Sequence, residues 1–142
     1  MKNQSTFEYL YSTNEDGVDV HMGINAKGDD IIFKLRESGC KEHEKAQRRH
    51  KKSLSLTRKN PDKEHEVLAK IVAEAIIVDW SGVLDEKNKP VECTYENRFE
   101  ALKKYKKLFY DVLTEATNEE NFRNFDPEYD EAADTEKNLK KS

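Results

Sequence analysis

Cys40, His43 and His50 are the residues whose types come closest to a metal-binding set in this chain. On a helix they would stand at positions i, i+3 and i+10, so their side chains could share one face. A zinc site requires four nitrogen or sulfur ligands at closer spacing, and the fourth ligand is missing here. We therefore interpret the two histidines as part of a basic polar helix, and we predict no metal site and no other cofactor.

Cys93 is a second candidate for chemistry, because it precedes a predicted helix start, where a thiolate would be stabilised. No histidine lies near it in the sequence, and the chain contains neither a GxSxG motif nor a glycine-rich phosphate loop. Acidic residues are so frequent that no pair stands out as acid–base machinery. We predict that the protein is not an enzyme and that both cysteines are reduced, inert thiols.

A basic run over residues 45–52, continued by Arg58 and Lys59, is the main charge feature. Residues 31–60 hold ten basic and three acidic side chains, although the whole chain has a net charge of −4. Such a stripe can contact phosphates, but no aromatic residues are interleaved with it and the protein is acidic overall. We favour a solvated helix face, or a docking surface for an acidic protein or for the chain's own acidic tail, over nucleic acid.

Apolar periodicity predicts the elements that position these residues. Alternation of apolar and polar residues predicts a β-hairpin over about 18–36. Helical spacing follows, and the most hydrophobic helix begins at Asn60-Pro61-Asp62, where Asn60 caps the first turn. This helix should form the centre of the core. The predicted helices span about 39–57, 61–80 and 94–116, with a short element at 118–125.

Together these elements predict an α+β fold that is mostly α, with the N-terminal hairpin packed on a small bundle of three or four helices. Residues 1–125 should form a single domain, and residues 126–142 a flexible acidic tail that is disordered in the free protein. No apolar run approaches the ~20 residues that a membrane span requires. The first residues show no apolar stretch typical of a signal peptide, so we expect a cytoplasmic protein.

Three aromatic residues are candidates for contact with a partner. Trp80 is the single tryptophan and stands at the end of a predicted helix. Phe122 and Phe125 lie in a short, otherwise polar element, where they either fold back on the core or anchor a partner. With Arg48 and Arg49 of the basic run, they make up the predicted protein-binding residues.

Six segments follow one another along the chain in this order: GVDVHMG, DDIIFKLRES, IVDWSGV, DEKNKPVECTYEN, NEENFRNF and EKNLKKS. Their order resembles that of the tail assembly chaperones of long-tailed phages, over about residues 17–142. The chain departs from the family pattern at Asn88-Lys89, where a glycine is common, and in the basic helix, which is more basic and less apolar than usual.

This resemblance implies a non-enzymatic role in tail morphogenesis, in the cytoplasm of an infected host cell or during prophage induction. Members of the family bind and solubilise the tape measure protein, a long helical chain, help to recruit tail tube subunits, and are generally absent from the virion. The groove between the 61–80 and 94–116 helices is a further candidate surface, and a homo-oligomer would multiply weak contacts. The alternatives are a structural tail or head–tail connector component of the virion and a small nucleic-acid-binding accessory protein.

Overall fold

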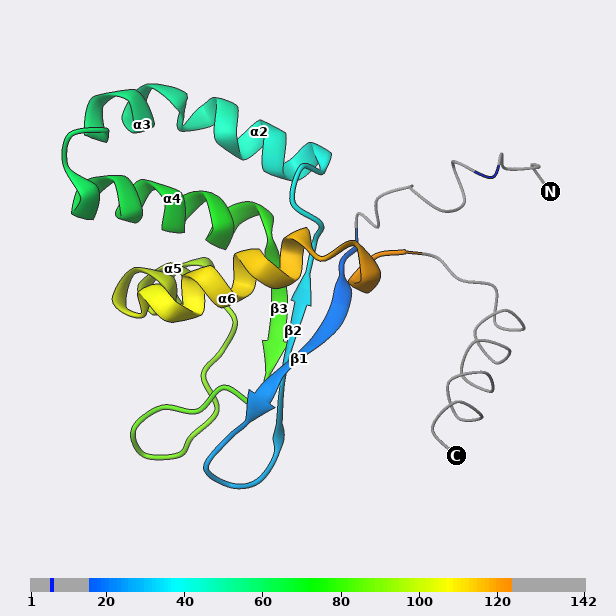
Figure 1. Cartoon of the computed structure of the whole chain (residues 1–142). Helices are drawn as coiled ribbons and strands as arrows, with labels where there is room; N and C mark the ends of the chain where they lie inside the picture. Colours follow the sequence, from blue (N-terminus) through cyan, green and yellow to red (C-terminus); the bar gives the residue numbers. More distant parts are fainter. Residues whose placement is uncertain (1–5, 7–15, 124–142) are drawn as a thin grey trace, which may run out of the picture. The chain divides into compact units, whose positions relative to one another are not determined.

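The computed structural model describes residue 6 and residues 16–123, and all elements below belong to the compact unit Thr13–Phe122. Three antiparallel strands form a sheet in the order β1-β2-β3, and helices α2 and α3 lie on one side of α4 while α5 and α6 lie on the other (Figure 1). The elements are β1 (Val18–Ile24), β2 (Asp30–Leu35), α2 (Lys41–Arg49), α3 (Lys51–Thr57), α4 (Pro61–Ala75), β3 (Ile77–Ser81), α5 (Tyr95–Lys104), α6 (Lys106–Thr117) and the 3-10 turn η1 (Glu119–Asn121).

The predicted fold class is confirmed, and the predicted hairpin is formed by β1 and β2. The turn between them is ordered by Asn25, whose side-chain oxygen accepts hydrogen bonds from the backbone N–H groups of Lys27 and Asp29. This is the local bonding that makes asparagine frequent in turns. Val20 faces Phe33 across the register, so the inward faces of both strands are apolar.

The structure differs from the prediction beyond Ala75, where α4 ends and residues 77–81 form β3 instead of the last turn of a helix. Strand β3 pairs with β2, and Trp80 stands opposite Phe33 with ring centroids 5.4 Å apart. The spacing of Ile76, Ile77 and Trp80 suits a helix, but the open edge of β2 offers backbone hydrogen bonds and the run is β-branched. A third strand also supports a hairpin that would be marginal alone.

Two other predicted helices are each divided by one non-helical residue. His50, with φ −102° and ψ 7°, separates α2 from α3, and Tyr105, with φ −111° and ψ 90°, separates α5 from α6. Of the predicted element at 118–125, the described residues form η1, after which Phe122 is buried. Phe125 and the predicted tail over 126–142 lie outside the described residues.

The main core lies between the sheet and helices α4, α5 and α6. A smaller cluster lies between α2 and α4, and Leu54 of α3 packs against it. Because the two clusters are separate, few apolar contacts hold α2 and α3 against the rest of the fold. The smaller cluster consists of Ala46, Val67, Ile71 and Ala75.

The Trp80-Ser81-Gly82 segment is structural. Trp80 is only 8% exposed, and its indole N–H donates to the carbonyl oxygen of Val91 at 2.8 Å. Gly82 has φ +79°, and a Cβ there would collide with the carbonyl of Asp30. Only glycine tolerates both conditions, so this residue fixes how closely the end of β3 approaches the hairpin turn.

Candidate functional site

An open groove lies between α2–α3 and α6, with α4 as its floor. Leu68, Ile71 and Val72 follow one another at i, i+3 and i+4 on α4 and line the groove from below, with Leu68 half-buried and Ile71 and Val72 buried. Leu54 of α3 and Leu113 of α6 stand on the walls and are half-buried. The lining residues are Ser38, His43, Gln47, Leu54, Leu68, Ile71, Val72, Phe109, Tyr110, Leu113, Thr114 and Thr117.

Tyr110 is the most exposed apolar side chain of this groove. It is 61% exposed, and its ring packs edge-on against the buried Phe109 with centroids 5.4 Å apart. An aromatic ring supported on one face and open on the other is suited to contact with a partner. Uncharged polar residues, including Gln47 and Thr114, stand beside the apolar lining.

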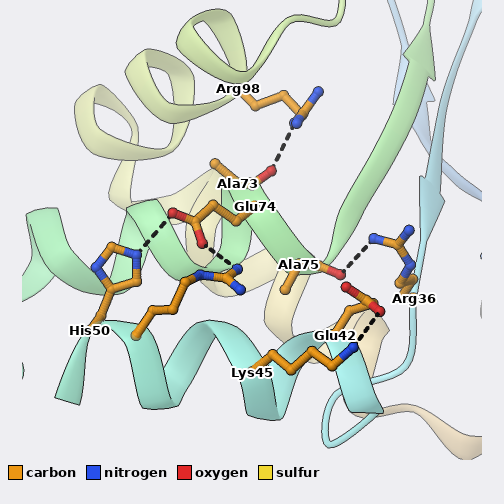
Figure 2. Close-up of polar contacts among 9 residues, drawn as sticks. Arg36, Glu42, Lys45, His50, Ala73, Glu74, Ala75 and Arg98 are labelled. Atoms are coloured by element: carbon orange, nitrogen blue, oxygen red, sulfur yellow. Dashed lines mark hydrogen bonds and ion pairs between the residues drawn. The ribbon is translucent and has the colours of Figure 1, made fainter.

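Glu74 of α4 attaches the wall formed by α2 and α3. Its carboxylate accepts a hydrogen bond from Arg49 Nη2 at 2.9 Å, and its other oxygen lies 2.9 Å from His50 Nε2 (Figure 2). Burial raises the pKa of Glu74, but hydrogen bonds and positive charge from His50 and Arg49 outweigh burial and hold the pKa below its ordinary value. The contact fixes α2 and α3 at the residue that separates them.

Two arginines fix the C-terminal end of α4 (Figure 2). Arg98 of α5 donates from Nε to the carbonyl oxygen of Ala73 at 2.8 Å, and Arg36, after β2, donates from Nη1 to that of Ala75 at 3.3 Å. The last carbonyls of a helix lack intrahelical partners and carry partial negative charge, so guanidinium groups satisfy them well. The floor of the groove is therefore anchored from two directions.

The three residues considered as metal ligands, Cys40, His43 and His50, are each buried or held by another contact. Cys40 is buried, and His43 Nδ1 accepts a hydrogen bond from the backbone N–H of Gly39 at 2.9 Å. Burial lowers the pKa of His43, which favours the neutral ring. His50 instead contacts Glu74, and no group of three His, Cys, Asp or Glu side chains within the described part of the chain is arranged to hold a metal.

Cys93 is held beside Arg98 of α5. The Arg98 guanidinium donates to the Cys93 carbonyl oxygen at 3.0 Å and lies 3.8 Å from its sulfur. Burial raises the pKa of the Cys93 thiol despite this positive neighbour. A raised pKa disfavours the thiolate that nucleophilic chemistry requires.

A second, basic hollow adjoins the groove along α2 and α3. Gln47 and Leu54 line both, so the two hollows adjoin at these residues, and together they are called the depression below. Arg48, Lys51 and Arg58 line this hollow and are called the basic edge below. The side chain of Arg48 is 74% exposed. The full lining is Glu44, Gln47, Arg48, Lys51, Leu54, Ser55 and Arg58.

A model of the YdaY prophage protein family matches residues 39–138. The chain belongs to the YdaY prophage protein family. The match includes α2, α3, α4 and α6, which form the groove, whereas β1 and β2 precede it. It confirms the prediction of a phage or prophage protein. No curated protein and no solved structure matches the chain significantly.

The structure places the predicted protein-binding residues of this YdaY family member in three different environments. Trp80 and Phe122 are packed in the main core, with 8% and 4% exposure. Arg49 is engaged with Glu74, Arg48 lies on the basic edge, and Phe125 lies outside the described residues. The groove instead combines aliphatic residues, some of them buried, with the exposed Tyr110.

Sequence reasoning located only part of this site. The groove between the 61–80 and 94–116 helices was predicted, and α4 and α6 do form its floor and one wall. The other wall was not predicted, because α2 and α3 carry a thin apolar stripe of Ala46, His50 and Leu54. None of the helices that the structure describes is long and apolar enough to cross a membrane.

Proposed function

We propose that this YdaY family protein is a tail assembly chaperone that binds and solubilises a tape measure protein and helps to recruit tail tube subunits. The observation that carries the proposal is the open apolar groove over α4, with Tyr110 exposed on its wall. A holdase requires apolar contact surface that its partner covers in the complex. The prophage family and the motif order that resembles tail assembly chaperones support the same role.

The geometry suits binding rather than catalysis. The nucleophile candidate Cys93 has a raised pKa, and the histidines His43 and His50 are each committed to a structural contact. A tape measure protein is largely helical, and a groove between packed helices is a common receptor for an amphipathic helix. We further propose that the protein acts in the host cytoplasm, does not stay in the mature virion, and gains avidity as a homo-oligomer.

Co-expression with the tape measure protein encoded by the same genome tests the proposal. We expect the tape measure protein to become soluble and to co-purify with this chain. The Tyr110→Ser variant should weaken the complex, whereas Tyr105→Ser, which changes a tyrosine of similar exposure outside the groove, should not. Aggregation of the tape measure protein despite abundant folded wild-type chain would contradict the proposed function.

The basic edge favours one other candidate function, a nucleic-acid-binding accessory protein. Lys51, Lys52 and Arg58 are exposed and, among the residues described, have no acidic side chain within 4.0 Å. Binding to duplex DNA that weakens steeply with salt and is lost in Arg48→Gln with Lys51→Gln would support this alternative. Presence of the protein in purified particles would instead support a structural component of the virion.

A further inference from the structure

The depression that runs along α2 and α3 has two chemically different parts. The apolar part lies between α3, α4 and α6 and is lined by Leu54, Leu68 and Leu113. The basic part lies along α2 and α3 and is lined by Arg48, Lys51 and Arg58. Gln47 and Leu54 belong to both. An occupant of the apolar part therefore has the basic residues along one of its sides.

The positive charge of this edge is poorly compensated. Arg48 lies 3.8 Å from Glu44, but both side chains are more than half exposed, and pairs of this kind are weak. Within the described part of the chain, Lys51 and Arg58 have no acidic side chain within 4.0 Å. On the opposite wall, the α6 residues Tyr110, Thr114 and Thr117 are uncharged.

We infer that this depression binds an amphipathic helix of the partner protein, with its apolar stripe over α4 and acidic residues on the flank that faces α2 and α3. Two observations select this occupant. The apolar floor requires an apolar stripe at i, i+3, i+4 and i+7, and the basic edge requires negative charge beside it. The inference rests on the proposed function, because it specifies which segments of the partner bind.

Nucleic acid fits the same depression less well. Phosphates would be attracted to Arg48 and Lys51, but Tyr110 is the one exposed aromatic ring of the described groove lining, and the floor of Leu68, Ile71 and Val72 offers neither charge nor aromatic faces for further bases. A helix can satisfy both parts at once. Protein is therefore the class of partner that the observations favour, and duplex DNA serves as a competitor in the test.

Two synthetic helical peptides with the same leucine stripe, one flanked by glutamates and one by lysines, test the charge preference on the full chain. We expect the glutamate peptide to bind about tenfold more tightly at low salt, because two or three exposed charge pairs act together. The preference should shrink as salt screens these pairs. Fluorescence anisotropy of labelled peptides measures both affinities.

Variants locate the binding site. Arg48→Glu with Lys51→Glu should abolish or reverse the preference, whereas Lys87→Glu with Lys89→Glu makes the same charge change in the exposed turn after β3 and should preserve it. Leu113→Glu should weaken both peptides. Because Leu113 is half-buried and this variant could unfold, the exposed Tyr110→Ser provides the same readout without burying a charge.

Several results would overturn the inference. Three of them concern the peptides: equal binding of both, no binding of either, and full competition by duplex DNA. The fourth is that the chain forms an oligomer with itself and that Tyr110→Ser dissociates this oligomer. The last result would make a second copy the occupant. If the wild-type chain and Arg48→Glu with Lys51→Glu keep the tape measure protein equally soluble, the proposed function stands and this inference fails. If the glutamate peptide binds but the tape measure protein aggregates, the proposed function fails and the preference of the depression for an acidic helix stands.

Discussion

Glu74 connects two helices that are distant in sequence, and its environment makes the connection dependent on pH. Its side chain is 24% exposed, and both of its oxygens have partners on α2 or at the residue after it. Because the partners hold the folded pKa below the ordinary value of 4.5, ionisation of Glu74 stabilises the fold. That contribution is fully present above the unfolded-state pKa and is lost as pH falls through the lower folded-state pKa.

The Glu74→Gln variant should accordingly lose about 1–2 kcal/mol of unfolding free energy at neutral pH, since it loses hydrogen bonds to charged groups. The difference from wild type should shrink as pH falls below about 4.5, where protonation removes the same charge from the wild type. Urea unfolding across pH 3 to 7 measures this. Glu66→Gln is the control, because the exposed pair of Glu66 with Lys103 at 3.7 Å should contribute little. A pH-independent difference would contradict the assignment.

Gly82 provides a second prediction at the scale of one residue. Gly82→Ala must strain a positive φ and place a Cβ against the Asp30 carbonyl, so it should destabilise the fold by about 2 kcal/mol or more. Gly28→Ala is the matched control, since Gly28 has φ +84° but nothing within 4 Å of the added Cβ. Its cost should be about 1 kcal/mol. Chemical denaturation measures the unfolding free energy that each variant loses, and the difference between the two losses is the cost of the collision. Equal losses would show that the protein relieves the collision between the added Cβ and the Asp30 carbonyl.

Among the elements, the turn between β3 and α5 shows how Asn88 can stand at a position whose backbone conformation suits a glycine. Asn88 has φ 59°, a left-handed conformation that asparagine tolerates better than most residues. The side chain of Asp85 accepts from the backbone N–H groups of Lys87 and Lys89 and closes the turn. An asparagine therefore performs the conformational role of a glycine at this position.

Substitutions of Asn88 test this explanation. Asn88→Gly should leave the unfolding free energy within about 0.5 kcal/mol of wild type, whereas Asn88→Val should lower it by about 1–2 kcal/mol because a β-branched residue disfavours positive φ. Thermal unfolding followed by circular dichroism suffices as the measurement. The turn lies outside the groove, so binding of a partner should be unaffected, and tolerance of valine would mean that the turn adopts another conformation.

An element could be predicted from the sequence where neighbouring residues determine it, and not where residues distant in the chain do. The hairpin and the start of α4 follow from local signals, such as the turn of Asn25 and the cap of Asn60, whose side chain accepts from Lys63 N. Strand β3 could not be predicted, because its partner strand β2 lies more than forty residues earlier and its apolar spacing also suits a helix. His50, at the break between α2 and α3, likewise contacts the distant Glu74.

The candidate site was harder to predict than the fold for a physical reason. Aromatic residues such as Trp80 and Phe122 stand out in a polar sequence, yet their large apolar surface favours burial, and the structure packs both in the core. The groove depends on residues of ordinary type, among them Leu54 and Leu113, which become a site only when α2, α3, α4 and α6 meet. No local pattern encodes that meeting.

For the molecule as a whole, the two core clusters predict unequal local stability. Helices α2 and α3 pack on a small apolar cluster of Ala46, Val67, Ile71 and Ala75 and on the Glu74 contact, whereas α4, α5, α6 and the sheet share the main core. Elements with few buried contacts open at lower free energy than the global transition. The wall of the groove formed by residues 41–57 should therefore open separately, which would admit a bulky helical partner.

Native-state hydrogen exchange tests this prediction. Amides of α3 should exchange faster than those of α4 and α6, and Glu74→Gln should accelerate exchange in α2 and α3 while leaving the sheet nearly unchanged. Glu66→Gln should have no such local effect, because its pair with Lys103 joins α4 to α5. Uniform exchange from α2 to α6 would mean that the groove wall opens only with global unfolding. Binding of the glutamate-flanked peptide should slow exchange in α2 and α3 most, since these helices would then be held from both sides.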